Sequence, residues 1–163
     1  TTGRIGYFRS NSASTSTREL VRIVNDNALA TGTTGLSITQ DSTAPALRIV
    51  TGDLELSDTD GFFNLGNSDP LTIASAAVTA TKSYHTIAGE GGTTDTLSTI
   101  NGGSDGAMLV LRAASSTYTV TIDETGNIDL TASMSFTQIR DTLTLIYSAG
   151  SASWIEISRA DNQ

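Results

Sequence analysis

The stretch TGLSITQDSTAPALRIVTGDLELSD, residues 34–58, repeats one short pattern three times. Each repeat places a polar residue between two apolar ones, and a fourth copy lies upstream: Val21-Arg-Ile23, Leu36-Ser-Ile38, Leu47-Arg-Ile49 and Leu54-Glu-Leu56. Alternation with a period of two is typical of a β-strand, and the Gly, Asn, Asp and Pro residues between the copies favour turns. Strands this short offer too little apolar surface to be stable in one chain alone.

A core shared between three chains would solve this problem, because each chain then contributes a few apolar side chains around one axis. We therefore predict a short-stranded trimeric β stalk over residues 19–60. Its trimer core would consist of Val21, Ile23, Leu36, Ile38, Leu47, Ile49, Leu54 and Leu56. The alternative is a monomeric β-domain with short edge strands, since the copies are separated by irregular intervals of 15, 11 and 7 residues.

The composition favours an all-β protein. Ser and Thr make up 47 of the 163 residues, while 37% of the chain is hydrophobic and 6% is aromatic. Thr and Val suit pleated, half-buried surfaces, and Gly and Asn suit turns. Because cysteine is absent, the chain has no disulfide, thiolate metal site or cysteine nucleophile. No apolar run approaches the length of a membrane span, and no signal-peptide pattern opens the sequence.

Longer strands are predicted in the second half of the chain. They follow a turn-rich joint at residues 61–70, whose Phe62, Phe63 and Leu65 we expect to pack beneath it. About eight short strands at this spacing predict a C-terminal β-sandwich or jelly-roll-like module over residues 71–163. The predicted strands are Leu71–Ala74, Ala76–Thr81, Ser83–Ile87, Ala107–Ala113, Thr117–Asp123, Asn127–Leu130, Thr142–Ser148 and Trp154–Ser158.

Two connections in this half have recognisable local patterns. The sequence DETGN, residues 123–127, predicts a tight hairpin turn in which Gly126 or Asn127 has a positive φ. The sequence TTDTLSTINGG, residues 93–103, predicts one helical turn that ends at Gly102.

The charge is unevenly distributed. Residues 1–25 have a local balance of +3, whereas the remaining residues have a balance of −11. This asymmetry indicates that the basic end binds something acidic, and we predict an extended anchoring arm at residues 1–18. Simple solvation of its arginines is the alternative. The basic patch is too small, and the rest of the chain too acidic, for nucleic-acid binding to be expected. The anchoring residues would be Arg4, Ile5, Tyr7, Phe8 and Arg9.

Two parts of the sequence resemble bacteriophage virion-surface proteins. TTGLSITQDSTAPALRIVTGDLEL is similar to the shaft-like β segments of phage fibre and head-decoration proteins, in which a G-L-x-I-x-Q-D phrase precedes a P-A-L-x-I phrase. DTLSTINGGSDGAMLVLRA, TVTIDETGNIDL and DTLTLIYSAGSASWIEISR are similar to a C-terminal β module of phage structural proteins. The resemblance covers residues 33–58 and 83–159 and implies a trimeric virion-surface protein without catalytic residues.

Tail fibres usually begin with a long region that attaches to the virion, whereas only a short arm precedes the β segment of this sequence. If the chain is complete, this departure favours a small decoration or head-fibre protein over a tail fibre.

Few residues suggest chemistry. His85 is the single histidine, so a Ser-His-Asp arrangement would have to use it, but its place within SYHTI, residues 83–87, favours the outer face of a strand and we expect no catalytic role. Asp58 and Asp60 resemble the start of a calcium loop, but the remaining ligand positions of that loop are missing, so they are weak metal candidates. No pair of carboxylates has the aromatic-lined surroundings of a glycosidase site.

Aromatic residues offer one further binding hypothesis. Tyr84, Tyr118 and Tyr147 would form a stacking platform for a surface glycan, together with Trp154. The alternative is that Trp154 belongs to the core and faces Tyr147 across a hairpin.

The prediction is therefore a non-enzymatic phage virion structural protein without a cofactor. It would be a homotrimeric capsid decoration (cement) or head-fibre protein on the virion surface, anchored by its N-terminal arm to the major capsid protein or another virion protein. One alternative is a tail-fibre or receptor-binding tip that attaches to a host surface glycan. The other is a monomeric carbohydrate-binding β module. No nucleic-acid or membrane partner is expected.

Overall fold

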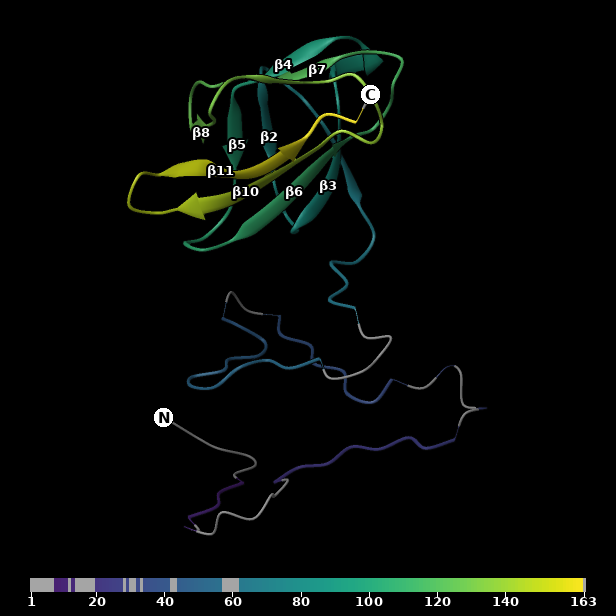
Figure 1. Cartoon of the computed structure of the whole chain (residues 1–163), viewed down its shortest axis with the longest axis vertical. Coiled ribbons are helices and arrows are strands. Elements are labelled where there is room, and N and C mark those ends of the chain that lie inside the picture. The colour runs from purple at the N-terminus through teal and green to yellow at the C-terminus, as the bar shows by residue number, and fades with distance from the viewer. Residues whose placement is uncertain are drawn as a thin grey trace. The chain divides into compact units, whose positions relative to one another are not determined.

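The computed structural model describes residues 8–11, 13, 20–27, 29, 32, 34–41, 44–56 and 62–162. The chain divides into two units, residues 1–57 and 58–163. The strands of the described residues all lie in the second unit, which we call the β module (Figure 1). The described residues form no α-helix, so the predicted all-β class is confirmed.

The eight predicted strands all overlap with observed ones, whereas β4, β5 and β9 were not predicted. One short 3-10 turn, Glu90–Gly92, accompanies them. The strands are β1 (Asp69–Thr72), β2 (Ala77–Thr79), β3 (Tyr84–Ala88), β4 (Asp95–Leu97), β5 (Thr99–Asn101), β6 (Met108–Ala113), β7 (Val120–Ile122), β8 (Ile128–Asp129), β9 (Met134–Phe136), β10 (Thr142–Ser148) and β11 (Ser153–Ala160).

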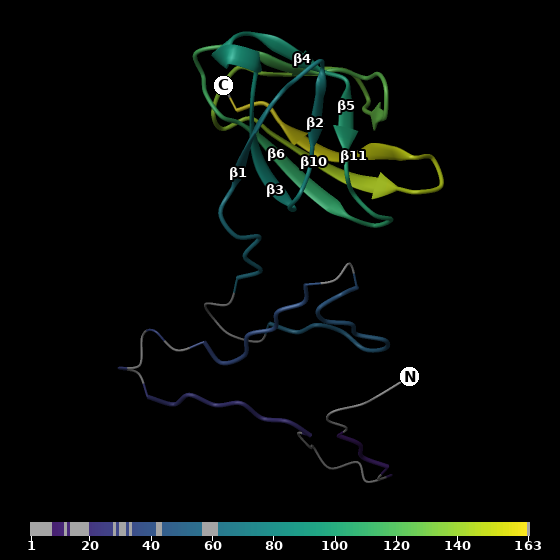
Figure 2. The ribbon, with the colours of Figure 1, turned by 180° about the vertical axis from the view of Figure 1, so that it is seen from behind.

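The chain of the β module winds through three sheets in turn. Strands β1, β3 and β6 pair in parallel, as do β2 with β5 and β4 with β7. Asp69 lies opposite His85, and His85 lies opposite Leu111, so equivalent positions of successive coils stack on one another. Figure 2 shows the same stacking from behind, where β2 and β5 run side by side. The arrangement is that of a short β-solenoid.

Antiparallel strands complete the module after the last coil. β9 pairs with β7, and the hairpin of β10 and β11 extends the large sheet beyond β6, which gives it the order β1-β3-β6-β10-β11-β8. The predicted sandwich or jelly-roll-like arrangement is not confirmed, because the turns carry the chain onward to the next sheet instead of back along the same one. Strand spacing alone does not distinguish these two paths, since both need short strands joined by Gly- and Asn-rich turns.

The core lies between the three sheets and follows the period-two pattern of their strands. In β6, for example, Leu109, Leu111 and Ala113 are buried, and the residues between them point the other way. Trp154 is 2% exposed and packs edge-on against Tyr147, with 5.2 Å between the ring centroids, so the core interpretation of Trp154 is confirmed. The buried apolar residues are Ile73, Val78, Ile87, Leu97, Ile100, Leu109, Leu111, Ala113, Val120, Ile122, Ile128, Leu130, Met134, Phe136, Leu143, Leu145 and Trp154.

The two predicted connections are corrected in part. Gly126 has a φ of +63°, as expected, but β7 and β8 are not partners, so residues 123–127 form no hairpin. The helical turn predicted over residues 93–103 is wrong, because this stretch forms β4 and β5. Both strands pair in parallel with strands of neighbouring coils, and a propensity argument confined to the stretch itself has no access to that pairing.

The first unit has a different character. Its described residues form no strand, including the four apolar-polar-apolar copies between residues 20 and 56. The strand interpretation of these copies is therefore not confirmed in the single chain, which offers them no partner strand among the residues the structure describes. Backbone pairing between strands is what turns an alternating sequence into a strand, and the described part of the first unit shows no such pairing.

Candidate functional site

The large apolar residues that the structure describes in the first unit are exposed. We use the name apolar segment for the described residues between 20 and 56. The eight residues proposed for the trimer core range from 45% exposed at Ile49 to 65% at Leu36. Leu29 and Val50, which were not in that set, are 88% and 77% exposed. Soluble monomers rarely expose this many large apolar side chains in one short stretch, so the apolar segment is a candidate interaction surface.

The anchoring residues are only partly visible. Arg4, Ile5 and Tyr7 lie outside the described residues. Phe8 is 70% exposed, and Arg9 is exposed beside it. An exposed aromatic ring next to a guanidinium suits contact with another surface, and the prediction of an anchor stays a prediction.

The β module carries a second apolar surface on its large sheet. Residues in register share a face of the sheet, so the residues that alternate with the core positions point away from the core, and Thr86 is the one of them that is itself buried. We call this set the outer face. Its members on β3, β6, β10 and β11 are Tyr84, Thr86, Ala88, Met108, Val110, Arg112, Thr142, Thr144, Ile146, Ser148, Ser153, Ile155, Ser158 and Ala160.

A groove lies at one side of the outer face. Residues Phe62–Gly66 form one wall, Tyr84 and Val110 form the other, and the hollow between them has a volume of about 470 Å³. The prediction that Phe62, Phe63 and Leu65 pack beneath the joint is wrong, because these side chains are 87%, 73% and 36% exposed. The stretch has no second layer of the chain on it within the described module, so the rings stay in contact with solvent.

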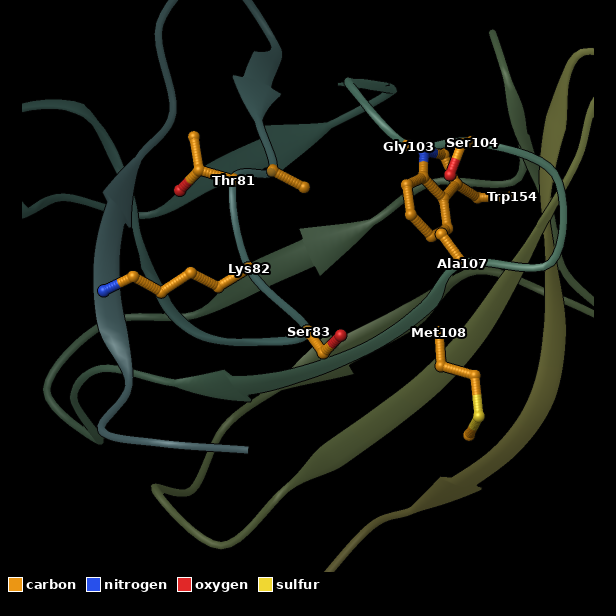
Figure 3. Close-up of a pocket in the computed structure, with 9 residues that line it drawn as sticks. Thr81, Lys82, Ser83, Gly103, Ser104, Ala107, Met108 and Trp154 are labelled. Atoms are coloured by element: carbon orange, nitrogen blue, oxygen red, sulfur yellow. The ribbon is translucent and has the colours of Figure 1, made fainter. Parts of the chain in front are cut away.

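A smaller hollow of about 280 Å³ lies beside the core tryptophan (Figure 3). Thr81, Ser83 and Ser104 line this hollow with hydroxyl groups. Trp154 also lines it, but its side chain is buried, and its indole Nε1 donates to the carbonyl of Ile100 at 3.1 Å. The Lys82 side chain points away from the tryptophan in Figure 3 and pairs with Asp69 at 3.5 Å. No aromatic face is therefore available here for sugar stacking.

The three tyrosines proposed for glycan contact lie on different parts of the module. Tyr84 is on the outer face, with the Arg112 guanidinium 6.0 Å from the centre of its ring. Tyr147 points to the other side of the same sheet, where it packs on Trp154. Tyr118 precedes β7 in another sheet and packs against the core. The structure does not bring them together into one platform.

His85 is fully buried, so its expected place on an outer strand face is wrong. Its Nδ1 donates to the carbonyl of Asp69 at 2.7 Å, and its Nε2 accepts the backbone N–H groups of Thr81 and Lys82 at 3.2 and 3.0 Å. A polar ring can be buried when every ring nitrogen has a partner. Both nitrogens are occupied in holding β1 and the turn before β3, which leaves neither for a metal or a proton transfer.

Two carboxylates near the C-terminal end of the module each accept several hydrogen bonds. The Arg159 guanidinium binds Glu156 with two hydrogen bonds, and the backbone N–H of Thr131 adds a third, which together lower the pKa of Glu156 to about 2. Burial raises the pKa of Asp141, but backbone N–H groups of Gln138, Asn162 and Thr137 outweigh it, so this pKa lies below its ordinary value. Both clusters tie loops to strands.

The weak metal candidates Asp58 and Asp60 lie outside the described residues. In the part of the chain that the structure does describe, no group of three or more His, Cys, Asp or Glu side chains is placed to hold a metal ion. Nor do these residues include a helix with the length and apolar character needed to cross a membrane.

Comparison with known proteins adds little. No protein family matches the chain, and no curated protein sequence does. Among solved structures, one similar chain comes from the "Structure of a chaperone-substrate complex", with 16% sequence identity and a TM-score of 0.42. The similarity covers 56% of this chain and 18% of that chain. Likeness at this level supports no inference about fold or function.

The outer face is the candidate surface that reading the sequence missed. Its signal was present, since Tyr84, Met108, Val110 and Ile146 are apolar at positions that alternate with buried ones. A strand with apolar residues on both faces is typical of a sheet that is covered on both sides. That pattern points to something beyond the module's own core.

Proposed function

We propose that this chain is a non-enzymatic, homotrimeric structural protein of a phage particle surface, of the capsid decoration or head-fibre type. The observation that carries the trimer is the exposure of the apolar segment, whose proposed core residues are 45–65% exposed in the single chain. Burial of apolar surface is the main favourable term in protein association. Copies of the same segment would supply an apolar cover and strand partners, neither of which its described residues have in the single chain.

Three copies fit this segment better than an unrelated partner. Each apolar-polar-apolar copy offers two side chains per level, and a closed threefold arrangement lets all levels meet around one axis. The polar residue at the centre of each copy, such as Arg22 or Glu55, would then point away from that axis. The alternating pattern thus supports an assembly in which one face of every short strand is shared.

The place on a phage particle rests on the sequence resemblance and on charge. The residues after 25 have a balance of −11, while the first 25 have a balance of +3, so the basic end is suited to an acidic particle surface and the acidic body is suited to project from it. Three linked arms also bind more tightly than one, because after the first contact the others form at a high effective concentration.

The mass of the full chain in solution tests the trimer. We expect three times the chain mass of 16.9 kDa by analytical ultracentrifugation. Ile38→Asp should reduce this to one chain mass, because it would bury a charge in the shared core, while the matched change Thr39→Asp, on the neighbouring polar position, should leave the trimer intact. A single chain mass for the unmodified protein would overturn the proposal.

Co-sedimentation tests the particle surface. The labelled trimer should bind saturably to virions stripped of it, and deletion of residues 1–17 should abolish that binding while the trimeric mass is kept. Unchanged binding after the deletion would contradict the anchoring arm. Binding to intact host cells instead of particles would identify a receptor-binding tip and refute the decoration role.

A further inference from the structure

The outer face of the β module is unusually poor in charge for this protein. The chain has a net charge of −8, yet of the fourteen outward positions on β3, β6, β10 and β11 only Arg112 is charged, and β8 at the edge of the sheet adds one carboxylate, Asp129, in register with Ile155. Met108 is 52% exposed, and Ile157, at the bulge of β11, is 51% exposed. A solvated face of an acidic protein would carry several carboxylates instead.

The same side of the module carries both a projection and a hollow. Phe62 and Phe63 project into solvent, and the groove of about 470 Å³ lies between their stretch and the pair formed by Tyr84 and Val110. At 87% and 73% exposure the two rings offer roughly 300 Å² of surface, more than a third of the ~800 Å² that each partner buries in a standard interface.

Arg112 adds a polar feature to this surface. Its Nε is buried and has no hydrogen-bond partner within the described chain, and its guanidinium lies over the ring of Tyr84. A buried N–H without an acceptor is costly, but this atom is already covered within the single chain, so the outer face presents the pair of Arg112 and Tyr84 to a neighbour and not the Nε.

We propose that the outer face packs against a second copy of the β module, with Phe62 and Phe63 of one copy against the groove that the next copy forms between Tyr84, Val110 and its own Phe62–Gly66 stretch. This inference rests on the proposed trimer, to which it adds a second contact within the module. A projection and a hollow on one chain make a head-to-tail contact, and three such contacts close into a ring.

Charge and connection both favour a copy of this chain as the occupant. Two acidic modules repel each other, and the outer face is where they approach with the least repulsion. Residues 57–61 alone separate the last residue of the apolar segment from Phe62. Copies joined through that segment therefore hold their modules at a high effective concentration, so even a modest contact between outer faces forms.

Photo-crosslinking of the full chain tests this contact. We would introduce p-benzoylphenylalanine in place of Phe63, and as a control in place of Thr96, which is exposed on β4 in a different sheet. Irradiation of the trimer should give a two-chain product from the first variant and several-fold less from the control. Cleavage with trypsin should then yield a link from the peptide of residues 49–82 to that of residues 83–112, which contains Tyr84 and Val110.

Different results would overturn the outer-face contact and the trimer. A trimeric mass without a two-chain product from position 63, or with a link to a peptide that lacks the groove residues, would overturn the outer-face contact alone. A single chain mass for the variant and for the unmodified protein would overturn the trimer and this contact with it.

Discussion

Two parts of the molecule contain nearly the same three residues and behave in opposite ways. Val120-Thr-Ile122 in the β module has its two apolar side chains 1% and 0% exposed, while Val21-Arg-Ile23 in the apolar segment has them 57% and 56% exposed. The first forms strand β7, which lies between β4 and β9. The second forms no strand. The difference lies in their neighbours, since both triplets alternate in the same way.

This comparison shows what a short strand needs. In the module, winding of the chain places β4 and β9 on either side of β7, and the rest of the core covers its apolar face. Among the residues that the structure describes, no strand lies on either side of the apolar segment. An alternating sequence therefore indicates that one face of the segment is apolar, and whether a strand forms depends on what pairs with the segment and covers that face.

The largest expected effect comes from placing a charge in each of the two triplets and comparing the stability of the module. Ile122→Asp places an unpaired charge in the closed core and should destabilise the module by more than about 4 kcal/mol. Ile23→Asp should leave module unfolding unchanged and reduce the mass of the assembly. Urea unfolding followed by fluorescence reports on the module alone, because Trp154 is the single tryptophan. Equal losses of module stability in the two variants would break the comparison.

Gly103 provides a test of how tightly the core of the module is packed around Trp154. This residue has a φ of +94°, and a β-carbon there would lie 2.6 Å from Cζ2 of Trp154. Gly103→Ala should therefore cost about 3 kcal/mol through backbone strain and overpacking. Gly106→Ala is the matched control, since its φ is +79° but no atom lies within 4 Å, so about 1 kcal/mol is expected. The same loss in both variants would show that the contact with Trp154 has no effect.

A smaller effect is expected where a side chain extends a strand ladder. Asn127 accepts the N–H of Ile100 at 2.9 Å and donates to its carbonyl at 2.8 Å, so its amide stands in for a strand of the next coil. Asn127→Ala should cost about 2 kcal/mol, because the Ile100 N–H loses its acceptor. Asn101→Ala, on an exposed position of β5, should change stability little. Neither change should alter the mass of the assembly.

The smallest predicted effect concerns pH. The pKa of Glu156 falls from an ordinary value near 4.5 to about 2, so its contribution to stability is present above pH 4.5 and is lost as the pH falls toward 2. We expect a loss of the order of 1–2 kcal/mol over this range. Glu156→Gln should flatten this part of the stability profile of the module and leave its value at pH 7 lower. A variant with the unchanged acid profile would rule out this ion pair as its cause.

The sequence predicted the strands of the module better than their arrangement. Alternation in residues 142–148 and 154–158 indicated a hairpin, and β10 and β11 pair as expected, with Tyr147 opposite Trp154. The winding of earlier strands was not predictable in this way, because a parallel partner lies in another coil. β4 pairs with β7 in a register that places Asp95 opposite Val120, and neither strand has a sequence feature that identifies the other as its partner.

Of the two candidate surfaces, only the apolar segment was predicted from the sequence. The apolar segment could be read from its triplets, because hydrophobic side chains at alternate positions need a cover wherever the chain places them. The outer face was missed, since its residues acquire a common side only when β3, β6, β10 and β11 lie in register. His85 was misplaced for a related reason: its burial depends on Asp69 and the turn at residues 81–82, which meet it only in the folded module.

Hydrogen–deuterium exchange of the full chain and of Ile38→Asp tests the central claim most directly. In the unmodified protein, we expect the amides of residues 20–56 to be protected along with those of the β module. In Ile38→Asp, protection of residues 20–56 should disappear while that of the module persists. Exchange of residues 20–56 at the rate of an unfolded chain in both proteins, at concentrations well above micromolar, would contradict the claim that this segment is completed by other copies of itself.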